Sequence, residues 1–315
     1  MSTKPFSSDS KMKTISSKHH HPRFDRRLPP VVTVAPGTEV VFETLDACYG
    51  EVHSLDDFKR HRQQPRRGGN PVTGPVYVET ARPGDTLVVE IRDIQLVGPG
   101  FQLIGPDRAI IEDEIVDVTF YEVVAHGDRF RLSNGLEFDT EPIVGCFGNA
   151  PAGEPVEDSN PLGGNCDVPA VRVGCKLYIP IEVPGALFSL GDVHARQGDG
   201  EVVGAPEMSA RVTARFEIKR DRHSEWFMVE DTTSWYSVTA APTEAEAARQ
   251  AVFQNARFIE NNHSVAFKDA LIILTMIGQL SISRTGKWGN AQPVVCSSFS
   301  KRELDDALSH YSPTG

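Results

Sequence analysis

Two stretches, APGTEVVFET (residues 35–44) and RPGDTLVVEI (residues 82–91), share one pattern and decide the expected fold. Each begins near a Pro-Gly pair, which favours a tight turn, and continues as a run of β-branched and apolar residues. Within residues 86–91, apolar and polar side chains alternate as in a strand with one buried face. We interpret the two stretches as similar hairpin-like units of packed sheets rather than as a solenoid repeat.

The remaining chain continues this β-rich pattern and turns helical only near its end. A capping box at Thr243–Glu246 precedes an alanine-rich run to about Asn261, which predicts a helix. Further strands are expected over residues 110–124, 129–136 and 201–219, and further helices over residues 266–280 and 302–309.

These elements predict a mainly β fold, with sandwich- or barrel-like sheets and a smaller C-terminal α/β part, so α+β overall. The polar N-terminus, residues 1–28, is expected to be a disordered arm. We place a β-rich N-terminal domain at residues 29–170. Residues 171–315 are expected to form a second β-rich region that carries an acidic loop and ends in the helices.

Composition narrows the possible partners of the chain. The formal net charge is −11, which argues against binding to nucleic acid because such proteins usually present a basic face. No apolar run reaches the roughly 18 residues needed to span a membrane. The N-terminus lacks an apolar export signal and the five cysteines form no CxxC pair, so we expect reduced thiols and a cytoplasmic location.

The most informative segment is GDVHARQGDGE, residues 191–201. It places one imidazole and three carboxylates on a glycine-rich loop that follows an apolar strand. Asp192 and His194 lie two residues apart, so both would face the same side of an extended strand. Such groups can hold a divalent metal or a hydrolytic water, although Asp-Gly turns are also common without any function. Asp199 and Glu201 supply the other two carboxylates.

Other segments carry candidate side chains, each with an ordinary structural explanation. Asp46 follows a strand, and Glu207 is expected to be exposed. Backbone N–H groups around Gly148 and Asn149 could face an anion or a carbonyl oxygen. The turn GGNCD, residues 163–167, suggests polar side chains that point inward; its members of interest are Gly164, Asn165 and Asp167.

These residue types match the needs of amide hydrolysis. The reaction needs a water made nucleophilic near neutral pH, which a divalent metal achieves by lowering the pKa of that water. It also needs donors for the developing oxyanion and a group that delivers a proton to the leaving amine.

The chain resembles the acetamidase/formamidase family of amide hydrolases. The matching phrases occur in the family's order and cover roughly residues 29–218: PGTEVVFETLDA (36–47), NPVTGPVYVETARPGDTLVVEIRDI (70–94), GCFGNAPA (145–152), GGNCD (163–167) and LYIPIEVPGALFSLGDVHARQGDGEVVG (177–204). The last phrase is the most specific. Cys166, Thr80 and the short GAPEM stretch depart from the family pattern, which places substrate preference in question more than reaction class.

The resemblance implies hydrolysis of short carboxamides such as formamide or acetamide, a β-rich fold, a homo-oligomer and a divalent metal, expected to be zinc, with calcium as the other candidate. Within the implied site we assign Asp46, Asp192 and His194 as metal ligands. Glu201 is the expected general base, with Asp199 as the other candidate. The expected substrate-orienting groups are Asn165, Gly148, Asn149, Gly164 and Asp167.

Two alternatives remain open at the level of sequence. The acidic loops could hold a structural calcium in a β-sandwich binding protein without turnover, since calcium prefers hard oxygen ligands. Alternatively, a carboxylate or Cys166 could act as the nucleophile of an amidase without a metal.

Overall fold

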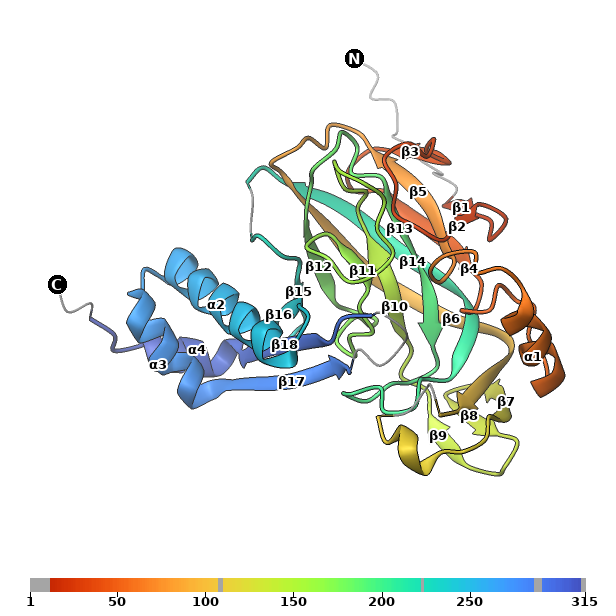
Figure 1. Ribbon diagram of the computed structural model, residues 1–315. Helices are drawn as coiled ribbons and strands as arrows, with labels where there is room; N and C mark the ends of the chain where they lie inside the picture. Colours follow the sequence, from red (N-terminus) through yellow and green to blue (C-terminus); the bar gives the residue numbers. More distant parts are fainter. Residues whose placement is uncertain (1–11, 107–109, 222–223, 286–290, 313–315) are drawn as a thin grey trace, which may run out of the picture.

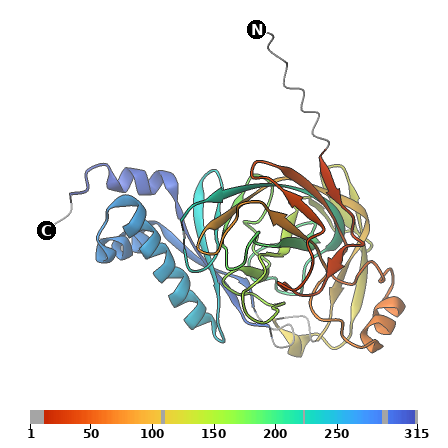
Figure 2. The same cartoon turned by 90° about the horizontal axis from the view of Figure 1, so that it is seen from above.

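The computed structural model describes residues 12–106, 110–221, 224–285 and 291–312. Strand is the commonest regular structure in this chain, and three of the four α-helices lie in its C-terminal part, so the expected α+β fold is confirmed. The strands form one extended, mostly antiparallel network that wraps around a common core (Figures 1 and 2). Over the described residues, no helix combines the length and apolar character needed to cross a bilayer.

The strands differ greatly in length, from two residues in β2 to the long β6 and β14. In chain order they are β1 (Lys13–Ile15), β2 (His20–His21), β3 (Val32–Val34), β4 (Glu39–Thr44), β5 (Val72–Val78), β6 (Thr86–Ile104), β7 (Thr119–His126), β8 (Arg129–Leu132), β9 (Glu137–Asp139), β10 (Ile143–Gly148), β11 (Gly163–Asn165), β12 (Lys176–Pro180), β13 (Phe188–His194), β14 (Glu207–Lys219), β15 (Met228–Glu230), β16 (Ser234–Ala240), β17 (Gly278–Arg284) and β18 (Val294–Ser300).

The two Pro-Gly stretches become β4 and the first part of β6, and both pair with the same strand. β14 runs antiparallel to β4 on one edge and to β6 on the other. Their inward side chains, including Val40, Phe42, Leu87 and Val89, are completely buried in the main core. The repeated sequence pattern therefore produces two strands that flank one long central strand.

The C-terminal helices begin where the sequence predicts. Thr243 caps the first of them, because its side chain accepts a hydrogen bond from the backbone N–H of Glu246. The later helices also fall within the predicted segments. These elements are α2 (Glu244–His263), α3 (Phe267–Ile277) and α4 (Lys301–Leu308).

The helices cover one face of a small sheet made by β16, β17 and β18, and together they form a C-terminal lobe beside the main β body (Figures 1 and 2). A second apolar cluster joins helix to sheet, with Phe258 and Ile259 of α2 packed near Phe299 of β18. The C-terminal end of β17 lies against the main body (Figure 1). The lobe therefore contacts the core through this strand as well as through the connecting segments of the chain.

One helix was not expected. α1 spans Leu55–Gln63, a stretch for which no helix was expected from the sequence. A short 3₁₀ turn, η1, comes much later in the chain at Glu112–Glu114. Ser54 caps α1: its hydroxyl accepts from the N–H of Asp57 and donates to the Asp57 carboxylate. This reciprocal cap, with acids in the first turn and basic residues in the last, stabilises a helix that buries only Phe58.

The N-terminal arm and the domain boundary differ from the expectation. Residues 1–11 lie outside the described residues, but β1 and β2 pair with β4 and β5, so the chain after residue 12 is part of the sheet. Contacts also cross the expected boundary at residue 170. β10 pairs with β13 across it, and the main core contains residues from Ile15 to Cys296.

Candidate active site

The register of four neighbouring strands gathers the acidic segments at one place. Cys146 of β10 lies opposite Asn165 of β11 on one side and opposite Gly191 of β13 on the other. At the end of β13, His194 lies opposite Glu207 of β14. The GGNCD turn, the GCFG strand and the GDVHARQGDGE loop, which are distant in sequence, therefore meet in space.

His194 is held in a defined orientation by Gln197. Its Nδ1 lies 2.8 Å from Gln197 Oε1, while Gln197 Nε2 donates to the carbonyl oxygen of Asp167 at 2.6 Å. The amide oxygen of Gln197 can only accept, so the proton of the ring lies on Nδ1. In the neutral imidazole, Nε2 then carries a lone pair, which faces Asp192 Oδ1 and Glu207 Oε1 at 3.6 Å each.

Asp192 presents one oxygen to donors and keeps the other free. Asn70 Nδ2 donates to its Oδ2 at 2.6 Å, and the Cys146 thiol lies 3.2 Å from the same oxygen. Asp192 Oδ1 is buried without a hydrogen-bond partner. Burial acts to raise the pKa of Asp192, but the nearby His194 ring and the donors at Oδ2 hold it below its ordinary value.

Asp167 approaches the same point through a glycine. A Cβ atom added to Gly145 would lie 2.5 Å from Asp167 Oδ1 and 2.9 Å from Asp192 Oδ2, so only glycine leaves room for both carboxylates. Asp167 Oδ1 is also buried without a partner. Burial and the charge of Asp192 raise the pKa of Asp167 to about 6.

Two glutamates complete the acidic cluster. Burial, followed by the charge of Asp167, raises the pKa of Glu201 well above its ordinary value, and its Oε2 is buried without a partner. Burial and the charge of Asp192 raise the pKa of Glu207 to about 7. In turn, the Glu207 and Asp192 carboxylates raise the pKa of His194 well above normal despite the opposing effect of burial.

The backbone of this cluster is strained. Asp167, Asp192 and Glu201 all have positive φ angles of 49°, 58° and 43°. Left-handed backbone costs a residue other than glycine on the order of 1–3 kcal/mol and is concentrated at functional sites. Three acids in this conformation in one cluster indicate that side-chain placement here is favoured over local stability.

The cluster has the properties of a cation site. Ligand atoms of Asp167, Asp192 and His194 lie within 4.8 Å of one another. Among the described residues, these three form the group of side chains that could hold a metal ion. Oxygens of Asp167, Asp192 and Glu201 are buried without donors, which is costly unless a positive charge compensates them. One imidazole nitrogen with carboxylate oxygens is a donor set that zinc commonly accepts. The residues therefore fit a divalent metal.

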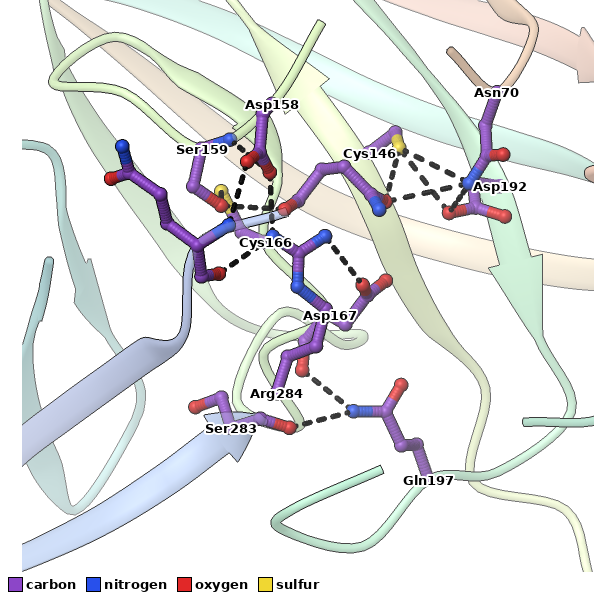
Figure 3. Close-up of polar contacts among 12 residues, drawn as sticks. Asn70, Cys146, Asp158, Ser159, Cys166, Asp167, Asp192, Gln197, Ser283 and Arg284 are labelled. Atoms are coloured by element: carbon purple, nitrogen blue, oxygen red, sulfur yellow. Dashed lines mark hydrogen bonds and ion pairs between the residues drawn. The ribbon is translucent and has the colours of Figure 1, made fainter. Parts of the chain in front are cut away.

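A buried arginine supports the cluster from the C-terminal lobe (Figure 3). Arg284, at the end of β17, is completely buried. Its Nη2 donates to Asp158 Oδ1 at 2.5 Å, and its Nη1 lies 3.6 Å from Asp167 Oδ2. Its guanidinium places a positive charge beside Asp167.

The structure brings together Asp167, Asp192, His194 and Glu201 from the sequence-predicted set, but it separates two other members. Asp46 is buried, yet its Oδ1 accepts hydrogen bonds from the backbone N–H groups of Cys48 and Gly50, and it lies outside the three-residue group. Asp199 is directed to Ser281 of β17 and is mostly exposed. Both acids instead stabilise turns or strand contacts.

Several residues expected to orient a substrate instead take part in strand pairing or in hydrogen bonds within the sheet. Gly148 pairs with Gly163 and Ser189 in the strand ladders, and Gly164 pairs with Phe147. Asn149 donates its side-chain amide to the Pro180 carbonyl at 3.0 Å. The Asn149 amide nitrogen therefore already has a structural partner, whereas its Oδ1 is buried without one.

Several side chains of the cluster were not among the residues predicted from the sequence, including Gln197 and Asn70, which contact His194 and Asp192. Glu207 was expected to be exposed but is buried beside His194, because the strand that follows the acidic loop returns along β13. The Cys146 thiol faces Asp192. Arg284 lies far along the chain. The signal available for it was a lone arginine in an otherwise uncharged strand, GQLSISR, residues 278–284.

Comparison with known proteins shows to which family this chain belongs. The sequence model of the acetamidase/formamidase family matches residues 7–160 and 158–240. The chain belongs to the acetamidase/formamidase family. The expectation from the sequence resemblance is thus confirmed, and the match includes the strands and loops that build the acidic cluster up to Glu207.

Individual members of the acetamidase/formamidase family are similar over different shares of the chain. The acetamidase of Mycolicibacterium smegmatis is 25% identical over 63% of this chain and 65% of its own length. The formamidase of Methylophilus methylotrophus is 24% identical over 64% of each. The chain thus spans about two thirds of the length of the curated relatives it matches. An acetamidase structure from Bacillus halodurans superposes with a TM-score of 0.84 at 29% identity, over 93% of this chain and 99% of that one.

Proposed function

We propose that the protein hydrolyses short linear carboxamides of the formamide and acetamide type to ammonia and the carboxylic acid. The observation that carries the proposal is the buried group of Asp167, Asp192 and His194 in a chain of the acetamidase/formamidase family. Each of these side chains is at most 3% exposed, so the site is shielded from water. This supports a substrate of few atoms.

We propose zinc as the metal and Asp167, Asp192 and His194 as the residues that would hold it. A divalent ion there would lower the pKa of a water and polarise the amide carbonyl. Imidazole nitrogen in the donor set supports zinc over calcium, which prefers oxygen ligands alone. The alternative of a calcium-holding binding protein is therefore not favoured.

Glu201 is proposed as the group that moves the proton. Its carboxyl group has a raised pKa and a free Oε2 in a dry environment, which suits a residue that takes a proton from water and delivers it to the leaving amine. Glu207 holds the Nε2 side of His194. Asn165 and Asn70 keep the Asp192 carboxylate fixed rather than contact substrate.

A thiol mechanism receives no support from the geometry. Burial raises the pKa of Cys166 to about 12, and its sulfur faces the Ser159 hydroxyl rather than the acids. A cysteine nucleophile needs a thiolate near neutral pH. The hydrolytic water is therefore the proposed nucleophile.

We further propose that the protein works as a cytoplasmic homo-oligomer, with a small amide and no nucleic acid or membrane as partner. Its five cysteines are buried free thiols, which supports a reducing compartment. The acidic net charge supports the absence of nucleic acid.

The test is ammonia release by the purified chain from formamide and acetamide, after removal of metal and again after addition of zinc. We expect release that depends on zinc and is abolished by His194→Ala. Absence of release from every short amide under every metal condition would contradict the proposal. Full activity of His194→Ala would contradict the site assignment.

A further inference from the structure

Arg284 is a charged side chain buried far from the sequence motifs that define the site. It lies at the end of β17, on the C-terminal lobe, and has no exposed surface. Burying a guanidinium is costly unless charged and hydrogen-bonding partners compensate it. Its partners therefore show what the buried charge does.

The guanidinium joins three segments (Figure 3). Nη2 donates to Asp158 Oδ1 at 2.5 Å and to the Gln292 carbonyl oxygen at 3.1 Å. Asp158 is fixed in turn, because its Oδ2 accepts from the backbone N–H of Gln292 at 2.9 Å. Nη1 points to the acidic cluster, 3.6 Å from Asp167 Oδ2. One planar group thus connects the C-terminal lobe to a proposed metal ligand.

Nη1 also determines the orientation of the Asn165 amide. An arginine has only donors and a carboxylate only acceptors. With its oxygen toward Arg284 Nη1 at 2.6 Å and its nitrogen toward Asp192 Oδ2 at 3.0 Å, Asn165 satisfies both neighbours. The opposite orientation would place its nitrogen against the guanidinium and its oxygen against the carboxylate.

We propose that Arg284 is a positioning residue of the hydrolytic site. It fixes Asn165, which holds Asp192 Oδ2 and leaves Oδ1 free, and it holds Asp167 Oδ2 in the same way. The C-terminal lobe therefore sets the geometry of two carboxylates that it does not itself contain. This inference rests on the proposed function and deepens it, because it adds a residue outside the motifs that identify the family.

A lysine at position 284 cannot reproduce the contacts of the guanidinium. Its ammonium is a point charge, whereas the guanidinium contacts Asp158 and the Asn165–Asp167 side at once with two nitrogens in fixed geometry. Outer-shell partners of metal ligands typically contribute about 10–100-fold to metal affinity or activity. Arg284→Lys should therefore keep the charge but lose the orientation.

The experiment compares the full chain with Arg284→Lys and with Arg257→Lys, which makes the same change at an exposed ion pair with Glu260 on α2. The readouts are zinc affinity of the metal-free protein, kcat and KM for formamide, and melting temperature. For Arg284→Lys we expect zinc affinity and kcat each about 10–100-fold lower, with KM within about threefold. Arg257→Lys should match the wild type within about twofold.

A double variant separates positioning from support of the fold. If Arg284 acts through Asn165, Asn165→Ala should reproduce most of the loss, and Arg284→Lys combined with Asn165→Ala should be little worse than either alone. Additive losses, or a lowered melting temperature with zinc affinity and kcat within about twofold of wild type, would overturn the proposal.

If Arg284→Lys does not fold, Asp158→Asn decides, because it weakens the far anchor of the guanidinium and leaves Arg284 itself in place. We expect about 3–10-fold weaker zinc binding, and unchanged binding would overturn the proposal. Failure of the wild type to hydrolyse any short amide would reject the proposed function alone, since zinc affinity still reports on Arg284.

Discussion

A single hydrogen bond decides which nitrogen of His194 faces the acids. Gln197 Oε1 accepts from Nδ1, and Gln197 is itself fixed by the Asp167 carbonyl oxygen. Partners of this kind orient ligating histidines in metal sites. The residue that follows the histidine by three positions is therefore as much a part of the site as the histidine.

Gln197→Leu is expected to lower zinc affinity by about 10–100-fold, because the ring loses the acceptor that holds Nδ1–H. Zinc titration of the metal-free variant measures this, and Gln95→Leu, at an exposed glutamine of β6, is the matched control. Equal zinc affinity of Gln197→Leu and wild type would show that another contact sets the ring.

Gly145→Ala is expected to disrupt the carboxylate pair directly. Its Cβ would meet Asp167 Oδ1 at 2.5 Å, and overpacking of this kind typically costs about 1–3 kcal/mol. We expect zinc affinity to fall at least about tenfold, together with a lower midpoint of urea unfolding. Gly153→Ala has open space around its new Cβ and should change neither quantity. Normal zinc binding by Gly145→Ala would disprove the close approach.

Sequence spacing was sufficient to predict that the site residues of one strand lie together. It was insufficient for the site residues that come from other strands. Asp192 and His194 are two residues apart on β13, so their spacing predicts that both face the same side, although Asp192 has a left-handed backbone with φ 58° rather than an extended one. Glu207 and Arg284 reach the site through strand register and lobe packing, which no local pattern encodes. Asp46 lies outside the three-residue group, and backbone N–H groups of its own turn take its Oδ1.

At the scale of elements, the predictable features were those with a local cause. α2 begins at its capping box, whereas α1 was missed although Ser54 and Asp57 form a similar cap. The sequence of α1 is charged, and only Phe58 is buried, so the apolar periodicity that indicates a helix is nearly absent.

The short strand β2 is anchored by a neutral histidine. His21 Nδ1 donates to the Arg23 carbonyl oxygen at 2.7 Å, and its Nε2 accepts from the Ser189 hydroxyl at 2.9 Å. Burial lowers the pKa of His21 to about 4. Between pH 4 and pH 6.5 the unfolded chain therefore binds a proton here that the folded chain does not.

His21 should thus stabilise the fold fully above pH 6.5 and lose this contribution as the pH falls toward 4. The part lost between pH 7 and pH 5 is about 2 kcal/mol. Urea unfolding at the two pH values should show this loss in wild type and in the exposed control His20→Gln, but not in His21→Gln. The same pH dependence in all three proteins would contradict the assignment.

At the scale of the whole molecule, the site belongs to both parts of the fold. The β body supplies Asp167, Asp192, His194 and both glutamates, and the C-terminal lobe supplies Arg284. Long-range pairing joins β10 to β13 across residue 170, where the sequence suggested a division. The α+β class and the family were predictable; the way the lobe completes the site was not.

Zinc should stabilise the folded chain as a whole, because a ligand that binds only the folded state adds RT ln(1 + [L]/Kd) to its stability. At 100 times the dissociation constant this is about 2.7 kcal/mol. Thermal unfolding of metal-free protein should therefore shift upward with added zinc, and the shift should vanish in Asp192→Asn. An equal shift in this variant would place the ion elsewhere.

The most direct test of the account is an anomalous-scattering map at the zinc edge from crystals of the zinc-loaded protein. The account predicts one peak per chain at about 2.0–2.2 Å from His194 Nε2 and from oxygens of Asp167 and Asp192. A map with no peak among these three side chains, or with its peak at Asp46 or Asp199 instead, would contradict it.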